Sequence, residues 1–154
     1  MRLIDMTEGI LSSADTKTHQ RYMFPVSEHC KILTFNLDYS PSFLEDEELS
    51  WEIIRQGQAK YEENIELLAE DSWKKYVPLK NLITVSLDDP VEFRGACHRK
   101  KDSQRLFISA GEASPGLMPG HLIAGQWTIT LSFHAIVTDR CEFKLEVWEE
   151  ESDL

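Results

Sequence analysis

Apolar and polar residues alternate with a period of two along several stretches of the chain, the pattern of a β-strand with one buried face. In residues 31–39, for example, Leu33, Phe35 and Leu37 share one face, and polar side chains lie on the other. The strands that this alternation predicts cover residues 21–24, 31–39, 83–88, 105–110, 127–135 and 141–147. A turn at residues 137–140 joins the last two as a hairpin.

A helical rhythm interrupts the strands between Pro41 and Pro78. Ser42 followed by Glu45 resembles a capping box. The pattern therefore predicts one long amphipathic helix over about residues 45–75, which Pro78 ends. Its apolar stripe recurs at helical spacing and consists of Trp51, Ile54, Tyr61, Ile65 and Leu68. The opposite face is strongly acidic, which is typical of a helix face in contact with solvent.

Six or seven strands with one polar face each predict two antiparallel sheets packed together, because strands of a parallel sheet are apolar on both faces. The expected fold class is mainly β, a jelly-roll-like antiparallel β-sandwich with one long inserted helix. At 154 residues the chain is long enough for one domain, which we expect to span residues 1–154. The pattern does not say whether the first twenty residues join a sheet. The acidic tail, residues 149–154, is expected to fray.

Charge narrows the range of partners. The 16 Lys and Arg stand against 27 Asp and Glu, a net charge of −11, which disfavours nucleic acids and anionic membrane surfaces. No apolar run approaches the roughly 20 residues that cross a bilayer, and the N-terminus lacks the order of a signal peptide. We expect a cytoplasmic protein. Its three cysteines fit that location, because an odd number cannot pair completely and no C-x-x-C pair occurs.

The segment of residues 94–105 is the most basic part of this acidic chain. It holds five of the sixteen basic side chains, namely Arg94, Arg99, Lys100, Lys101 and Arg105. Guanidinium groups in such a cluster suit a phosphate or another anion. The alternative is a solvated loop that balances the acidic helix. Both interpretations stay open, and the segment is the best functional lead that residue chemistry alone provides.

Residues 111–127 form a glycine-rich loop with four of the seven glycines and two of the six prolines, which indicates tightly specified turns. The loop lacks the G-x-x-x-x-G-K pattern of a phosphate-binding loop, and it leads into a strand where a phosphate-binding loop leads into a helix. It is either a rigid rim of a binding site, to which His121 and Trp127 belong, or an ordered connection between the sheets.

The histidines carry no recognisable metal motif, because neither H-x-H nor H-E-x-x-H occurs. His98, His121 and His134 lie near the basic segment, the glycine-rich loop and a polar strand face, so they are the set that folding could bring together. We predict no bound metal, no cofactor and no catalytic residue. Cys97 beside His98 makes a weak nucleophile pair, since adjacent strand residues point to opposite faces.

Several segments, read in order, resemble those of a known family. They are Tyr39-Ser40-Pro41, Asn81 to Pro90, Phe93-Arg94-Gly95 with His98-Arg99, Ala113 to Gly116, Pro119-Gly120, Gly125-Gln126-Trp127 and His134 to Thr138. The succession resembles the N-terminal β-sandwich region that precedes the catalytic domain of carbaryl-hydrolase-like (CehA/McbA-type) metallohydrolases. These belong to the polymerase-and-histidinol-phosphatase (PHP) superfamily of metal-dependent phosphoesterases.

The resemblance implies an accessory module, not an enzyme. The catalytic domain of that family binds its metals through an H-x-H motif, and this chain has none. No catalytic or metal-binding residue is therefore transferred, and the implied partner is a separately encoded phosphoesterase. Arg94, His98, Arg99 and Trp127 match motif positions to which the resemblance assigns no role.

Three hypotheses follow. The first is a non-catalytic binding or accessory module, with a PHP-type phosphoesterase or a second copy of the chain as its partner. The second is a binder of a small anionic ligand. The candidate binding residues for either are Arg94, His98, Arg99, Arg105, His121, Trp127 and His134. The third, a metal-dependent hydrolase using His98, His121 and His134, ranks last because no acid–base pair stands at a defined spacing.

Overall fold

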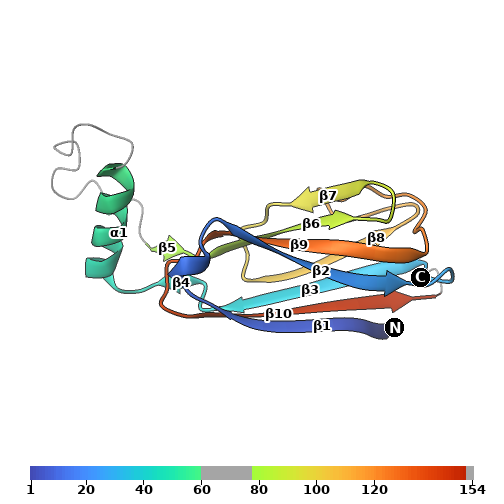
Figure 1. The fold of residues 1–154 in the computed structure, drawn as a ribbon, viewed down its shortest axis with the longest axis horizontal. Coiled ribbons are helices and arrows are strands. Elements are labelled where there is room, and N and C mark those ends of the chain that lie inside the picture. The colour runs from blue at the N-terminus through green and yellow to red at the C-terminus, as the bar shows by residue number, and fades with distance from the viewer. Residues whose placement is uncertain (60–77, 152–154) are drawn as a thin grey trace.

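The structure is a computed structural model that describes residues 1–59 and 78–151 (Figure 1). Its elements are β1 (Arg2–Leu11), the short 3-10 helix η1 (Ser13–Asp15), β2 (Thr18–Val26), β3 (Ile32–Ser40), β4 (Phe43–Leu44), α1 (Glu47–Ala59), β5 (Leu79–Lys80), β6 (Leu82–Asp88), β7 (Phe93–Cys97), β8 (Ser103–Ser109), β9 (Gly125–Ala135) and β10 (Cys141–Glu150).

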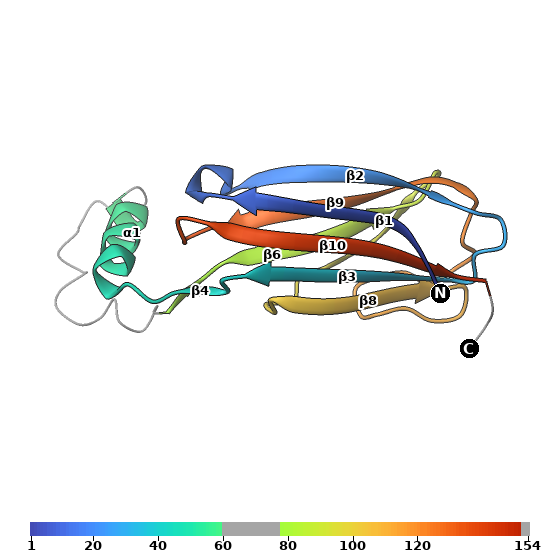
Figure 2. The ribbon, with the colours of Figure 1, turned by 90° about the horizontal axis from the view of Figure 1, so that it is seen from below.

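Eight of these strands form two four-stranded antiparallel sheets. Sheet A has the order β1-β10-β3-β8, and sheet B has the order β2-β9-β6-β7. Figure 2 shows the strands of sheet A side by side. The two sheets pack face to face, so the predicted β-sandwich is confirmed. The short strands β4 and β5 pair only with each other.

The core lies between the two sheets because apolar residues occupy every second position of the long strands. On β9, Trp127 and Leu131 are fully buried, whereas the polar residues between them point outward. Phe24 of sheet B meets Phe35 of sheet A edge to face, with 5.8 Å between ring centroids. Such aromatic contacts connect the two inner faces.

The first 26 residues form two full strands, one at an edge of each sheet. β1 pairs with β10 and β2 pairs with β9 along their whole lengths. The sequence predicted only a strand at residues 21–24 here. Alternation is weak in both strands because an edge strand exposes apolar side chains, and Met6, Ile10 and Met23 are between 48% and 62% exposed.

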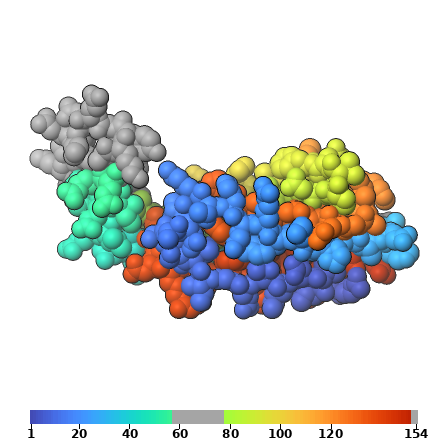
Figure 3. Space-filling model, in the orientation of Figure 1, coloured from blue at the N-terminus to red at the C-terminus, as the bar shows by residue number. Residues whose placement is uncertain are grey.

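The predicted helix over residues 45–75 starts later than expected. α1 covers Glu47–Ala59, and residues 60–75 lie outside the described residues. Asp46 caps the helix in place of Ser42, because its Oδ1 accepts a hydrogen bond from the N–H of Leu49 at 3.1 Å. α1 lies beyond β4 and β5 at one end of the sandwich (Figures 1 and 3). Within the described residues, no helix is long and apolar enough to cross a membrane.

The start of the predicted frayed tail belongs to sheet A instead. β10 continues to Glu150. The side chain of Glu149 is buried and forms an ion pair with Arg2 of β1. The tail is therefore ordered at least this far, while residues 152–154 lie outside the described residues.

Candidate functional site

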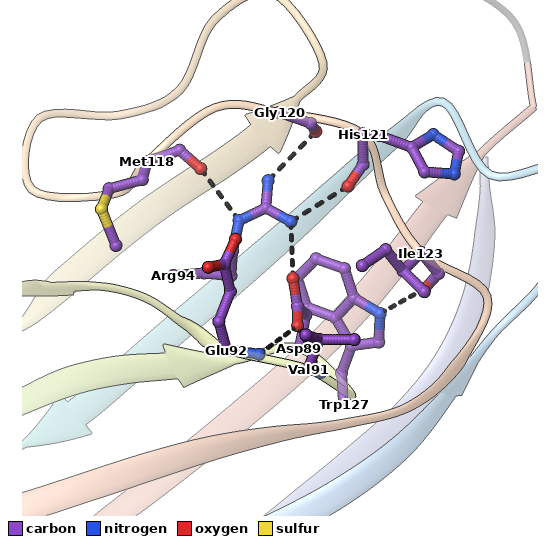
Figure 4. A network of polar contacts seen from close by, with 9 residues as sticks. All are labelled: Asp89, Val91, Glu92, Arg94, Met118, Gly120, His121, Ile123 and Trp127. Carbon is purple, nitrogen blue, oxygen red and sulfur yellow. Dashed lines mark hydrogen bonds and ion pairs between the residues drawn. The ribbon is translucent and has the colours of Figure 1, made fainter.

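Arg94, on β7, is buried, and four of its five N–H groups bind the chain itself (Figure 4). Nη1 donates to Oδ2 of Asp89 at 3.0 Å and to the carbonyl of His121 at 3.1 Å. Nε donates to the carbonyl of Met118 at 3.1 Å, and Nη2 donates to that of Gly120 at 3.0 Å. Arg94 was a candidate for gripping an anion, but its guanidinium connects β7 to the glycine-rich loop.

Asp89 and Trp127 complete this group, which we call the Arg94 cluster. The guanidinium carbon lies 5.2 Å from the centroid of the buried Trp127 ring, a cation–π contact. The Asp89 carboxylate also accepts the N–H groups of Val91 at 2.6 Å and Glu92 at 2.7 Å. Burial by itself raises the pKa of Asp89, but these hydrogen bonds and Arg94 bring the net pKa below its ordinary value. The cluster is therefore a satisfied ion pair inside the fold.

The glycine-rich loop covers the free edges of both sheets on one side of the sandwich. The N–H of Ala96 on β7 donates to the carbonyl of Gly116 at 3.1 Å, and the N–H of Ser114 donates to that of Phe107 on β8 at 3.0 Å. Gly95 has a φ of +114°, and a Cβ there would meet the Gly116 carbonyl oxygen. The loop is thus an ordered connection that pairs with both edge strands.

A second buried polar group centres on Asn81, just before β6. Its Nδ2 donates to the carbonyl of Pro41 at 2.8 Å and to Oγ1 of Thr138 at 2.9 Å. Its Oδ1 accepts the N–H of Val137 at 2.7 Å. These residues, the Asn81 cluster, tie together the chain after β3, the start of β6 and the turn between β9 and β10.

The structure brings together two of the three histidines that were considered as metal ligands. The rings of His98 and His134 lie 6.1 Å apart between centroids. The backbone carbonyl of His121 binds the guanidinium of Arg94 beside Trp127. Trp127 and His134 are seven positions apart along β9, which is about 23 Å. Among the described residues, no group of three His, Cys, Asp or Glu is placed to hold a metal ion. The three-histidine site is therefore not formed.

The two remaining arginine candidates lie in different elements, and Arg99 directly follows His98 in the chain. Arg105 is exposed on β8 and stands opposite Asn36 on the outer face of sheet A. Arg99 is half-buried in the loop after β7, where its carbonyl oxygen is 3.4 Å from Nε2 of Gln104. The predicted basic segment thus divides between the core, a loop and the opposite sheet.

His98 and His134 belong to a line of polar side chains across the outer face of sheet B. His19 stands opposite Ser132, and Ser132 stands opposite Thr84. His98 continues the line beside Thr84, because Cys97 of β7 pairs with Val85 of β6 and the same register extends by one residue. Nδ1 of His19 lies 2.8 Å from Oγ of Ser132, and Nε2 of His134 lies 2.6 Å from Oγ1 of Thr84. We call His19, Ser132, Thr84, His98 and His134 the histidine row.

A groove of about 700 Å³ adjoins the histidine row on the same face. We call it the sheet B groove. Its lining comes from β2, β9 and β6 and consists of His19, Arg21, Met23, Ser86, Asp88, Thr128, Thr130 and Ser132. None of these residues was predicted as a site residue, although the alternating Thr128, Thr130 and Ser132 signal a polar strand face.

A groove of about 720 Å³ lies on the outer face of sheet A. Its side chains include the carboxylates of Glu8, Asp38, Asp102 and Glu142, together with Lys144. It contains no histidine and no arginine. The candidate residues that the structure gathers on one surface therefore lie on sheet B.

No protein-family model matches the chain, and no curated protein matches it.

Proposed function

We propose that the chain is a non-catalytic binding module and that the sheet B groove is its binding surface. The groove itself supports this most directly, because about 700 Å³ lies within the range of roughly 300–1,000 Å³ that small-molecule sites occupy. Its Ser and Thr hydroxyls can each donate and accept hydrogen bonds, and Arg21 and His19 add N–H donors at one edge.

The rigidity of the scaffold under the groove supports the same proposal. β6 and β9 are the central strands of sheet B. The Arg94 cluster fixes the turn after β6 and the start of β9, and the Asn81 cluster fixes the other ends of both strands. Binding side chains on fixed strands keep their positions better than side chains on loops.

A thermal-shift screen with chemically varied metabolites tests this function. We expect at least one compound to raise the melting temperature of the wild-type protein. Thr130→Arg, in the middle of the groove, should abolish that rise because the larger side chain fills the space. Asn36→Arg is the matched control, since Asn36 is also half-buried and lies on a central strand of sheet A, with its side chain on the outer face. A flat response of the wild type, or an equal response of all three proteins, contradicts the proposal.

The order of the motifs favours a second, compatible role, that of accessory subunit to a separately encoded PHP-type phosphoesterase. Affinity purification from the native cell, followed by mass spectrometry, should then recover such an enzyme in near-equal amount. Recovery of no such enzyme, with a lone monomer in size-exclusion chromatography, speaks against this role and leaves the groove proposal in place.

A further inference from the structure

The outer faces of the two sheets differ in charge. Among the outward side chains of the sheet A strands, five are acidic and two are basic: Glu8, Asp38, Glu142, Glu146 and Glu150 against Lys144 and Arg105. On the described strands of sheet B, Asp88 is the one outward acid, and Arg21, His19 and His134 share that face. Among the described strands of this chain, whose net charge is −11, the outer face of sheet B is therefore the face with fewer carboxylates to repel an anion.

Arg21 is the strongest anion-binding group on this face. It is exposed on β2 and stands opposite Thr130, which stands opposite Ser86. Within the described residues its guanidinium has no hydrogen-bond or ion-pair partner. Its planar set of N–H donors is therefore available, and it matches the oxygens of a phosphate or carboxylate group.

Two histidines on the same face are already oriented by hydroxyl groups: His19, two residues from Arg21 on β2, and His134, four residues along β9 from Thr130. The Ser132 hydroxyl bonds Nδ1 of His19, and the Thr84 hydroxyl bonds Nε2 of His134. A hydrogen bond to one ring nitrogen fixes the orientation of the ring and determines whether the other nitrogen donates or accepts a hydrogen bond. Both side chains are exposed, so the second nitrogen of each ring is available to a ligand.

We infer that the sheet B groove binds an anionic small molecule, whose phosphoryl or carboxylate group lies between Arg21 and His19. The rest of the ligand follows the hydroxyls of β9 and β6 toward Asp88. This inference rests on the proposed function. It places the anion site on the outer face of sheet B and not at residues 94–105, because four of the N–H donors of Arg94 bind groups within the protein.

A titration of backbone amide signals by NMR tests the inference, with inorganic phosphate as the probe and acetate and glucose in parallel. We expect phosphate, or acetate if the natural group is a carboxylate, to shift the amides around Arg21 and Ser132 saturably, with a Kd in the millimolar range. Arg21→Gln should raise that Kd at least tenfold, and Arg21→Lys should raise it less. Arg105→Gln, on the opposite sheet, should leave it unchanged.

The outcomes separate this inference from the function on which it rests. Anion shifts that do not saturate, or that Arg21→Gln leaves unchanged, overturn the inference. Saturable shifts of the groove amides with glucose alone also overturn it, but they support the binding module. No response of the groove amides to any probe, together with a flat thermal-shift screen, overturns both.

Discussion

The substitution Arg94→Met tests whether Arg94 holds the fold together or is held ready for a ligand. Methionine keeps a long flexible side chain in the space but removes the charge and all N–H donors. The buried Asp89 carboxylate then loses its counter-charge at 3.0 Å, and three carbonyls of the glycine-rich loop lose their donor. We therefore expect a loss of stability, not a local change at an exposed site.

The structure sets the size of that loss. Removing one partner of a buried ion pair costs about 3–5 kcal/mol, because the other charge stays buried without compensation. Asp89 keeps the N–H groups of Val91 and Glu92, so we expect a value near the lower limit, about 3 kcal/mol. Since a domain is stable by about 5–15 kcal/mol in total, this is a large fraction.

Urea denaturation followed by tryptophan fluorescence measures the loss. Arg105→Met removes an exposed arginine and should change the free energy of unfolding by no more than about 0.5 kcal/mol. The double variant Arg94→Met/Asp89→Asn should lose less stability than the sum of the losses of Arg94→Met and Asp89→Asn, because both single changes remove the same interaction. A loss below about 1 kcal/mol for Arg94→Met, or strict additivity, refutes the structural role and makes Arg94 available for the ligand role that the sequence suggested.

Three other outcomes follow from buried groups. The pKa of Asp89 is lower in the folded state, so its ionised carboxylate stabilises the fold above the unfolded-state pKa of about 4, and this stabilisation is lost as the pH falls through the folded-state pKa. In urea titrations, the difference in stability between wild type and Asp89→Asn should therefore be smaller below about pH 4 than at pH 7. Gly95→Ala places a Cβ at a φ of +114°, against the carbonyl oxygen of Gly116 and 2.8 Å from the Cα of Leu117. It should cost about 2 kcal/mol or more in thermal melts, whereas Gly111→Ala, with nothing within 4 Å, should be neutral. Burial raises the pKa of all three thiols, that of Cys30 to about 11, so Ellman's reagent at pH 8 should react with three thiols only after denaturation.

The central strands of the fold could be predicted because each buries one complete face. β9 places Trp127 and Leu131 in the core and hydroxyls outside, and that contrast is visible in the sequence. β1 and β2 could not be predicted as full strands, because their apolar residues occur on exposed positions as well as buried ones. Met6 and Met23 break the alternation, and pairing with β10 and β9 decides their structure.

The candidate site was beyond the reach of the sequence for two physical reasons. The groove exists because the register of sheet B brings His19 to Ser132, which are 113 residues apart in the chain. The pattern of a strand shows which residues share a face, but it does not show which face of another strand lies beside them. The contacts of Arg94 inside the fold could not be predicted either, because its counter-ion, Asp89, lies across a turn, and only the turn geometry makes burial of the pair favourable.

The segments behind the resemblance to the accessory region of PHP-type metallohydrolases supply the two buried clusters. Asp89, Arg94 and Trp127 form one, and Asn81 and Thr138 belong to the other. The contacts of these two clusters close the sandwich at its ends, so a likeness in the cluster residues concerns how the fold is closed. Of the groove residues, only Ser86 and Asp88 of β6 lie within the segments of the resemblance. The β2 and β9 walls of the groove lie outside those segments. Substitutions in the β2 and β9 walls, such as Arg21→Gln and Thr130→Arg, should therefore change binding and leave stability unchanged. Substitutions in the two clusters, such as Arg94→Met, should reduce stability first. Comparing the two sets of variants separates binding residues from residues that hold the fold together.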